Sequence, residues 1–243
     1  MEILTGKNLA KPYRLLIYGS PGVGKSTLAN TAKKPIFLDV EDGISQIDTH
    51  KTNQIKSIKD LSDAITWLIN NTGEYSTVVI DTIDAFDAVI ANELCTNNSK
   101  QSLSDFSYGQ GYDLLNQKWR KIINGLDMLI AKGYNIILLA HHQIKRFEDP
   151  TSEGWDKILL RMHAKPAASL MGWVDSMWYY DFEKVFSSAK SGEKKKVLAT
   201  GSRILHTRNK AAFDGKCRYG TPEKIEVNDK FTLSVFEDKI KGN

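Results

Sequence analysis

Four short apolar runs in the first part of the chain predict β-strands that are buried on both faces. They are residues 14–18 (RLLIY), 35–40 (PIFLDV), 77–81 (TVVID) and 135–140 (NIILLA). Each run is rich in Ile, Val and Leu, and polar residues follow it. Continuous apolar runs of this length, rather than alternating ones, are typical of strands in a parallel sheet.

Segments with helical spacing lie between these runs. They are residues 25–33, 61–70 and 112–132. The third is the clearest, because one apolar stripe is formed by Leu115, Trp119, Ile122, Ile123, Leu126, Leu129 and Ile130. We interpret this stripe as packing against a sheet. Strands that alternate with helices predict an α/β fold with a mostly parallel, doubly wound sheet.

The last part of the chain has a different pattern. Further strands are predicted at residues 174–182, 196–200, 203–207 and 230–236, with turn sequences at Ser191-Gly192 and Asp214-Gly215. We expect these strands to extend the same sheet in antiparallel fashion. No linker rich in Pro, Gly or Ser separates the two parts, so the sequence predicts a single domain over residues 1–243.

Composition narrows the class of protein. Of the 243 residues, 41% are hydrophobic and 26% are charged, as in globular proteins with a sizeable core. Two cysteines, Cys95 and Cys217, are too few for a disulfide framework. Residues 1–11 lack a signal-peptide apolar block, and no run approaches the roughly 20 apolar residues of a membrane helix. We therefore expect a cytoplasmic protein with reduced thiols and no membrane partner. The net charge of +4 permits a nucleic-acid partner without indicating one.

A phosphate-binding motif follows the first predicted strand. The pattern G-x-x-x-x-G-K-[ST] and the residue after it are matched by Gly19, Ser20, Pro21, Gly22, Val23, Gly24, Lys25, Ser26 and Thr27. The glycines let successive backbone N–H groups turn towards phosphate oxygens. Lys25 places a positive charge near the β and γ phosphates, and Ser26 offers its hydroxyl to Mg²⁺. A strand before the motif and a helix after it favour this interpretation over a chance match in a glycine-rich turn. The sequence thus predicts ATP as the ligand, together with Mg²⁺.

Two acidic positions complete a predicted hydrolytic site. Asp81 ends the third apolar run, where a carboxylate can hold Mg²⁺ beside the phosphates. Alternatively, Asp81 could cap the next helix, although Asp84 is available for that role. Glu41 belongs to an acidic cluster at residues 39–42, from which it could reach a water in line with the γ-phosphate. Taken alone, such a cluster is usually a solvated loop.

The order of these motifs resembles the RecA family of recombinases over most of the chain. That family has a D-x-E pattern whose glutamate activates water, and the match here is Asp39-Val40-Glu41. Its fourth strand ends in N-Q-I-R, and the corresponding stretch here is residues 141–146 (HHQIKR). The resemblance implies a RecA-like P-loop ATPase fold with Glu41 as the catalytic base. It also implies that Gln143 is a switch residue that senses the γ-phosphate.

The resemblance extends to two DNA-contacting loops, which would be residues 97–111 and 144–165. The second holds cations that can follow a phosphate backbone and aromatic rings that can stack on bases: Lys145, Arg146, Phe147, Trp155, Lys157, Arg161, His163 and Lys165. Single-stranded DNA is the partner that these loops imply. The alternative is a solvated surface loop with a few packed aromatic side chains.

A later match implies an oligomer. RecA proteins carry K-N-K-x-A-A-x-F, whose lysines reach the neighbouring subunit's ATP, and residues 208–213 here read RNKAAF. By this resemblance, Arg208 and Lys210 would neutralise phosphate charge across the interface of a ring or filament. The alternative is an ordinary basic strand end.

The chain also departs from RecA. Its P-loop strand begins by Arg14, so we expect no counterpart of the RecA N-terminal helix and strand, and we also expect no separate C-terminal domain. In this it resembles the phage-encoded Sak-type single-strand annealing ATPases, which are grouped with phage AAA-type P-loop proteins. The resemblance implies a role in phage DNA recombination, with a single-strand binding protein as a further partner.

Three functions fit these residues. The first is ATP-dependent binding and annealing of single-stranded DNA. A hexameric helicase or loader motor shares the same motifs, and directional unwinding would distinguish it. A nucleotide-gated binding module with little turnover, acting through protein partners, is the third, and DNA binding that is absent or insensitive to salt would favour it. Finally, the adjacent His141 and His142 point to opposite faces of a strand, so we expect one to pack and one to line the site.

Overall fold

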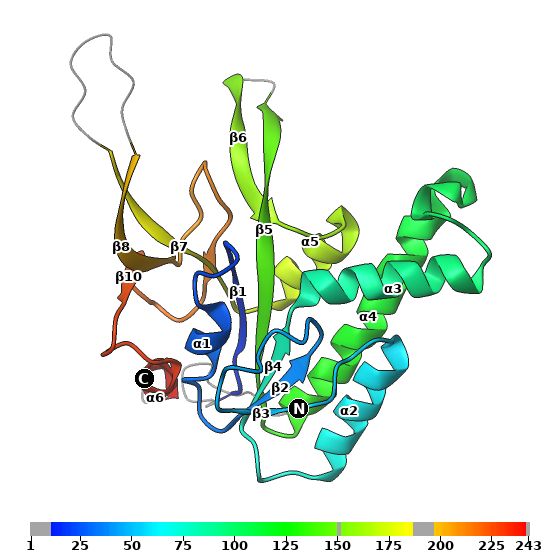
Figure 1. Cartoon of the computed structure of the whole chain (residues 1–243), viewed down its shortest axis with the longest axis horizontal. Helices are drawn as coiled ribbons and strands as arrows, with labels where there is room; N and C mark the ends of the chain where they lie inside the picture. The colour runs from blue at the N-terminus through cyan, green and yellow to red at the C-terminus, as the bar shows by residue number, and fades with distance from the viewer. Residues whose placement is uncertain (1–10, 150–151, 187–196, 242–243) are drawn as a thin grey trace, which may run out of the picture.

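The computed structural model describes residues 11–149, 152–186 and 197–241. A ten-stranded sheet runs in the order β10-β8-β7-β1-β5-β4-β2-β3, with β6 paired to β5 and β9 paired to β7 (Figure 1). The strands are β1 (Arg14–Gly19), β2 (Pro35–Asp39), β3 (His50–Lys51), β4 (Thr77–Asp81), β5 (Asn135–Asp149), β6 (Ser152–Leu160), β7 (Ser176–Phe186), β8 (Val197–His206), β9 (Lys216–Cys217) and β10 (Lys224–Val227).

The sheet has a parallel centre and antiparallel additions. Strands β7, β1, β5, β4, β2 and β3 pair in parallel. In contrast, β8, β9, β10 and β6 join their neighbours in antiparallel pairs. This arrangement confirms the predicted α/β fold, with a mostly parallel sheet and antiparallel C-terminal strands. The prediction that residues 1–243 form one domain stays a prediction.

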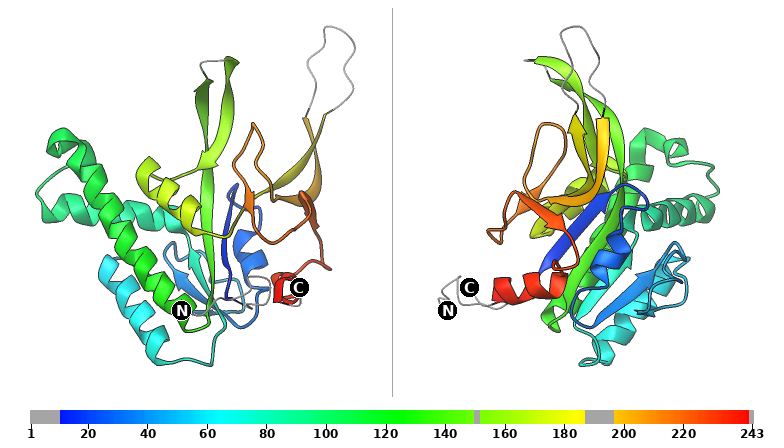
Figure 2. Two further views of the ribbon diagram at one scale, coloured as in Figure 1. Left: turned by 180° about the vertical axis from the view of Figure 1, so that it is seen from behind. Right: turned by 60° about the vertical axis from the view of Figure 1, so that its left-hand side comes forward.

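Helices cover both faces of the sheet (Figures 1 and 2). They are α1 (Lys25–Ala29), α2 (Ile58–Asn70), α3 (Ile83–Asn97), α4 (Gln110–Ala131), α5 (Ala164–Trp173) and α6 (Leu233–Lys241). One apolar core joins the sheet to α2, α3, α4 and α5, and a second joins the opposite face to α1 and α6. The predicted apolar stripe of α4 contributes Leu115, Trp119 and Leu126, which are completely buried. None of the helices in the described ranges is long and apolar enough to cross a membrane.

Strand register decides which residues meet at the carboxyl edge of the sheet. Gly19 at the end of β1 lies opposite His141 of β5. Asp81 at the end of β4 lies opposite Asp39 of β2 and Leu139 of β5. Because parallel strands end at the same edge, the P-loop, the acidic cluster and the middle of β5 are brought together there.

Two predictions about the elements are wrong in an informative way. The predicted loop at residues 144–165 is largely a β-hairpin, because β5 continues far beyond residue 140 and β6 returns beside it. The hairpin projects beyond the body of the protein (Figures 1 and 2). The two strands predicted at residues 196–200 and 203–207 are one strand, β8, as far as it is described. Periodicity alone cannot show where a strand leaves the core and continues in solvent.

Residues 230–236 were expected to form a strand but lead into helix α6. Phe231, Leu233 and Val235 alternate with polar residues, which is a strand pattern. In the structure, however, Leu233 and Phe236 are buried against the sheet, at helical spacing, while Val235 is exposed. The Thr232 hydroxyl accepts a hydrogen bond from the backbone N–H of Val235, which supports the first turn.

Smaller differences concern turns and the first helix. Helix α1 ends at Ala29, four residues before the predicted end. The turn predicted at Asp214-Gly215 comes slightly earlier, where Lys210 and Phe213 exchange backbone hydrogen bonds. The turn predicted at Ser191-Gly192 lies outside the described residues.

Gly19 is needed for the close approach of β1 and β7. A Cβ atom at this position would lie 1.9 Å from the backbone carbonyl oxygen of Tyr180. We therefore expect Gly19→Ala to lower the free energy of unfolding by about 1–3 kcal/mol through overpacking. Urea unfolding measures this change.

Gly172 in α5 provides the matched control, because a Cβ atom there meets nothing within 4 Å. Gly172→Ala should leave stability unchanged or raise it by up to about 1 kcal/mol. Equal effects of the two substitutions would contradict the steric argument.

Candidate nucleotide site

The P-loop forms the floor of a pocket at the carboxyl edge of the sheet. Gly22 and Gly24 have φ angles of 74° and 95°, a conformation that L-residues with side chains rarely adopt. The ammonium group of Lys25 donates hydrogen bonds to the carbonyl oxygens of Gly19 at 3.2 Å and Ser20 at 2.9 Å. Burial lowers the pKa of Lys25, although nearby carboxylates oppose this effect. The two carbonyl contacts hold the Lys25 side chain inside the loop. The side chain therefore loses little conformational entropy when it binds a phosphate.

Ser26 and Asp81 meet at one side of this pocket. The Ser26 hydroxyl donates a hydrogen bond to Oδ2 of Asp81 at 2.5 Å. Burial raises the pKa of Asp81, and the hydrogen bond from Ser26 partly offsets this effect. A hydroxyl and a carboxylate oxygen side by side form the hard oxygen donor set that Mg²⁺ prefers. The predicted magnesium ligands are thus adjacent, and their chemistry fits this ion.

Helix α3 does not use an aspartate as its N-cap. Thr82 fills this position, and its hydroxyl accepts a hydrogen bond from the backbone N–H of Ala85 at 3.3 Å. The expectation that Asp84 could be the cap is therefore wrong, but Asp81 is still left available for a metal ion.

Glu41 is the member of the acidic cluster that lines the pocket. The carboxylates of Asp39 and Asp42 are both engaged by Lys51, at 2.8 and 3.2 Å. Asp39 also accepts a hydrogen bond from the backbone N–H of Asp42 and is fully buried. The Glu41 side chain is 35% exposed and carries no such contact to Lys51. The structure thus separates one available carboxylate from two structural ones.

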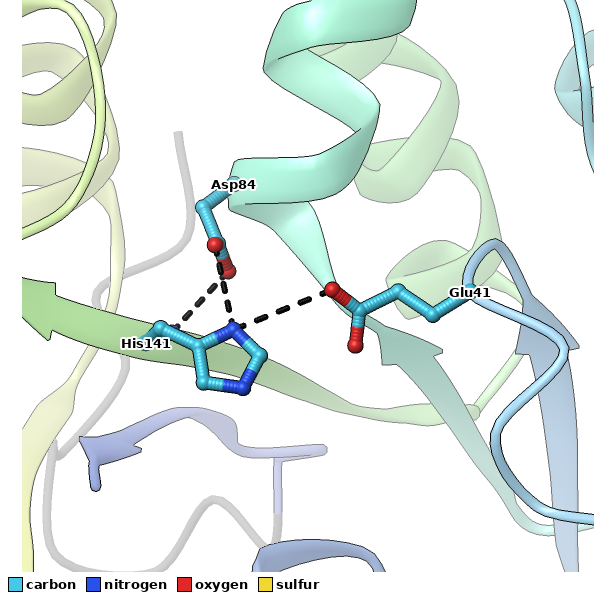
Figure 3. Close-up of side chains that lie close together, drawn as sticks. All are labelled: Glu41, Asp84 and His141. Carbon is cyan, nitrogen blue, oxygen red and sulfur yellow. Dashed lines mark hydrogen bonds and ion pairs between the residues drawn. The ribbon is translucent and has the colours of Figure 1, made fainter. Parts of the chain in front are cut away.

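His141 faces Glu41 across the pocket and is anchored from behind by Asp84 (Figure 3). Its Nδ1 atom lies 3.1 Å from Oδ2 of Asp84 and 3.8 Å from Oε1 of Glu41. Its backbone N–H donates to Oδ1 of Asp84 at 2.9 Å. Figure 3 shows the second ring nitrogen pointing away from both carboxylates. The neighbouring His142 packs instead with its ring against Tyr179, so the two histidines are on opposite faces.

The pocket that these residues enclose has a volume of about 340 Å³. It combines loop N–H groups, the Lys25 ammonium, a metal-binding pair and a carboxylate on the opposite side. This combination suits a polyphosphate better than an apolar ligand.

The family model for the AAA domain matches residues 11–219. The chain belongs to this AAA domain family. It is also similar to the SPbeta prophage-derived uncharacterized protein YorG of Bacillus subtilis (strain 168), with 26% identity over 131 residues. That match covers 52% of the chain and 40% of the relative, so the similarity spans less than half of YorG. The AAA domain match makes the chain a nucleotide-binding protein of the P-loop ATPase class.

A second cavity lies next to the nucleotide pocket of this AAA domain. It has a volume of about 540 Å³ and is lined by Asp84, Ala85, Asp87, Ala88, Gln143, Lys145, Arg161, Met162, His163 and Ala164. Gln143, the predicted γ-phosphate switch, belongs here and not to the nucleotide pocket, because its amide donates to the carbonyl oxygen of Leu160 at 2.8 Å. The β5 residue in the nucleotide pocket is His141, two positions earlier.

The structure divides the predicted DNA-binding residues between two faces of the hairpin. Strand pairing puts Lys145 opposite Lys157, and Phe147 opposite Trp155, on the face that continues into the second cavity. Arg146 alternates to the other face, 3.6 Å from Glu148. It therefore does not join the other predicted residues.

Most cations of this set already have acidic partners. Lys157 contacts Asp214 at 2.6 Å, Lys165 pairs with Asp113, and Arg161 pairs with Asp84. Within the described ranges, Lys145 is the member of the set without an ion pair. The net positive charge available to a phosphate backbone is thus smaller than the sequence suggested.

The proposed trans-acting residues lie in the segment between β8 and β9. Arg208 turns inward, since its Nη2 atom donates to the carbonyl oxygen of Thr221 at 2.8 Å and its Nη1 atom is buried. It is not placed to extend into a neighbouring subunit. Lys210 is about half exposed and pairs with Glu223, so its role at a subunit interface stays a prediction.

The sequence does not identify Asp84 as the residue that holds the site together, because its partners His141 and Arg161 lie far from it along the chain. Burial by itself raises the pKa of Asp84, but hydrogen bonds from His141 and Arg161 hold this pKa down at about 2. A carboxylate whose folded-state pKa is below its ordinary 3.8 stabilises the fold above that pH, and the stabilisation is lost as pH falls towards the folded value.

We therefore expect Asp84→Asn to lower the free energy of unfolding by about 2 kcal/mol at neutral pH. The difference from the wild type should shrink as the pH falls from about 4 towards 2, because the wild-type carboxylate then takes up its proton. Urea unfolding over a pH series measures this. Asp63→Asn, which removes a carboxylate that is 63% exposed, is the control and should have no measurable effect. A pH-independent loss would place the effect in packing rather than charge.

Proposed function

We propose that this AAA domain protein hydrolyses ATP with Mg²⁺ and uses the cycle to bind and anneal single-stranded DNA. The observation that carries the hydrolytic part is the contact between Ser26 and Asp81 beside Lys25, with Glu41 on the opposite side of the same pocket. A loop that only bound phosphate would need neither the metal pair nor the opposing carboxylate.

Each residue has a definable task in this proposal. The P-loop N–H groups and Lys25 hold the β and γ phosphates and neutralise their charge. Ser26 and Asp81 would hold Mg²⁺, which supplies electrostatic stabilisation of the phosphate oxygens when bound. Glu41 accepts a proton from the attacking water. His141 is fixed by Asp84 through Nδ1 and presents its other ring nitrogen as a hydrogen-bonding group.

Replacement of the base should separate binding from turnover. We expect Glu41→Gln to bind ATP with near wild-type affinity but to hydrolyse it about 100-fold more slowly or worse, because the amide cannot accept the proton. Lys25→Ala should lose ATP binding and serves as the blank.

The neighbouring Asp42 gives the matched control for Glu41. Its carboxylate is 64% exposed and pairs with Lys51, so Asp42→Asn should keep wild-type turnover. Equilibrium binding of ATP and single-turnover hydrolysis together provide the measurement. Wild-type turnover by Glu41→Gln would move the base to another residue.

The hairpin supports the nucleic-acid part of the proposal. Its face beside the second cavity carries Lys145, the Phe147 and Trp155 rings with centroids 5.0 Å apart, and Lys157 above the Phe147 ring. Phe147 is partly exposed and can stack on a base. Aromatic rings with interleaved cations bind single strands without needing a particular sequence. A role in phage DNA recombination is part of the proposal, and the prophage origin of the relative YorG supports its phage part.

We expect an oligo(dT) strand to bind the protein and to stimulate ATP turnover. Because few cations are available, the logarithm of the binding constant should fall only gently with the logarithm of salt concentration, with a slope of about −1 to −2. Phe147→Ala should weaken binding by about 1–3 kcal/mol through the loss of base stacking. Trp67→Ala is the control, because it removes an exposed ring from α2, where Trp67 is 49% exposed. This substitution should leave oligo(dT) binding unchanged.

The alternative functions predict other outcomes. Turnover that ignores DNA, with binding absent or insensitive to salt, would support a nucleotide-gated module that acts through protein partners. Unwinding of a forked duplex in one direction would support a helicase or loader motor. Faster pairing of complementary single strands, dependent on ATP, is the result that annealing requires.

A further inference from the structure

The second cavity has hydrogen-bond donors that its own carboxylates leave free. The Nε and Nη2 atoms of Arg161 donate to Oδ2 of Asp84 at 2.8 and 2.5 Å, and its Nη1 atom has no hydrogen-bond partner within the described ranges. Nδ1 of His163 contacts Oδ2 of Asp87 at 2.7 Å, which leaves the opposite ring nitrogen available. Buried acids thus fix one side of each basic group and leave its other side for a ligand.

Lysines of the hairpin point to the same kind of ligand. Lys145 lines the cavity and lies directly opposite Lys157 in the strand register. Like charges in this arrangement repel, and the Asp214 carboxylate compensates only Lys157, at 2.6 Å. An anion beside Lys145 would remove the remaining repulsion. An anionic ligand is therefore the chemistry that the cavity fits.

A metal ion does not fit the acidic group at the boundary of the two cavities. The ligand atoms of Glu41, Asp84 and His141 lie within 4.8 Å of one another, as metal ligands often do. However, the guanidinium of Arg161 already supplies the positive charge there, at 2.5 Å from Asp84 and 3.1 Å from Nδ1 of His141. The arginine therefore occupies the place that a cation would take.

Arg161 connects the two cavities physically. On one side it lines the second cavity. On the other side its partner Asp84 also holds His141, which faces Glu41 in the nucleotide pocket. The backbone N–H of Arg161 donates to the carbonyl oxygen of His141 at 3.0 Å, so the main chains are joined as well. A ligand that draws the guanidinium from Asp84 must change the anchoring of His141.

We propose that the second cavity binds a backbone phosphate of single-stranded DNA through Arg161, Lys145 and His163, and that Arg161 transmits this binding to the nucleotide pocket through Asp84 and His141. The proposal rests on the proposed function, since it supplies the route by which DNA stimulates turnover. The phosphate competes with Asp84 for the guanidinium. His141 is then held less tightly, and its contact with Glu41 changes.

Binding of oligo(dT) across a salt series tests the site itself. We expect Lys145→Gln and Arg161→Gln each to reduce the magnitude of the salt slope by about one phosphate contact and to weaken binding several-fold. Arg120→Gln removes an exposed arginine from α4 and should change neither quantity. The mononucleotide dTMP should stimulate turnover far less than oligo(dT), because the cavity is proposed to take a strand.

Stimulation of ATP turnover tests the connection. Lys145→Gln should require several-fold more oligo(dT) for half-maximal stimulation but reach the wild-type maximum. Asp84→Asn should still bind oligo(dT) and ATP, yet its ratio of stimulated to basal rate should fall to near one. A purely structural role of Asp84 would instead lower both rates together and leave that ratio unchanged.

The outcomes distinguish this proposal from the proposed function. If the wild type does not bind oligo(dT), the nucleic-acid function fails. If the wild type binds but Lys145→Gln and Arg161→Gln bind equally well, the function stands and the cavity is not the site. Stimulation by dTMP equal to that by oligo(dT) would also overturn the proposal, in favour of a free phosphate ligand. If Arg161→Gln fails to fold, Lys145→Gln decides the site and Asp84→Asn the connection.

Discussion

Strand β5 lies between β1 and β4, and its pairing with both brings the P-loop, Asp81 and His141 to the same edge of the sheet. The register puts His141 level with Gly19 of the P-loop, and Leu139 level with Asp81. Beyond this point β5 leaves the core and becomes one strand of the hairpin. A single strand therefore passes from the nucleotide pocket to the surface proposed for DNA. Its first half is stiffened by two parallel neighbours, so a displacement at the hairpin has a direct mechanical path to the pocket.

Asp84 adds an electrostatic connection between the nucleotide pocket and the second cavity, because it contacts both His141 and Arg161. A carboxylate that is almost completely buried is costly unless positive charge and hydrogen bonds compensate it. Here the compensation comes from His141 on the nucleotide side and Arg161 on the cavity side. The side chains of both partners contact the same oxygen atom, Oδ2 of Asp84. For this reason a change in one partner must alter the environment of the other, which is the physical basis for a connection between the two cavities.

The distribution of charge on the hairpin and in the segment after it also limits the chemistry of this surface. Lys157 of β6, Arg161 just after β6, and Lys165 of α5 each pair with an aspartate. Paired cations attract a phosphate backbone less strongly than isolated ones, because part of their field is already cancelled. Stacking on Phe147 and a few directed donors would therefore contribute more than bulk positive charge. The modest net charge of +4 is in keeping with such a surface.

The sequence by itself determined the parallel core and the P-loop motif, and it predicted that Glu41 and Asp81 belong to the same pocket, which they line. These signals are local, because a short apolar run, a glycine pattern and a strand-end carboxylate are each recognised from a few consecutive residues. Tertiary structure alone decided the extended hairpin, helix α6 in place of a strand, and the inward turn of Arg208. It also selected His141 over Gln143 for the nucleotide pocket and made Asp84 a junction between distant residues. The physical reason is that burial, strand register and charge pairing depend on contacts between segments far apart in the chain. A pattern read along the chain does not contain those contacts.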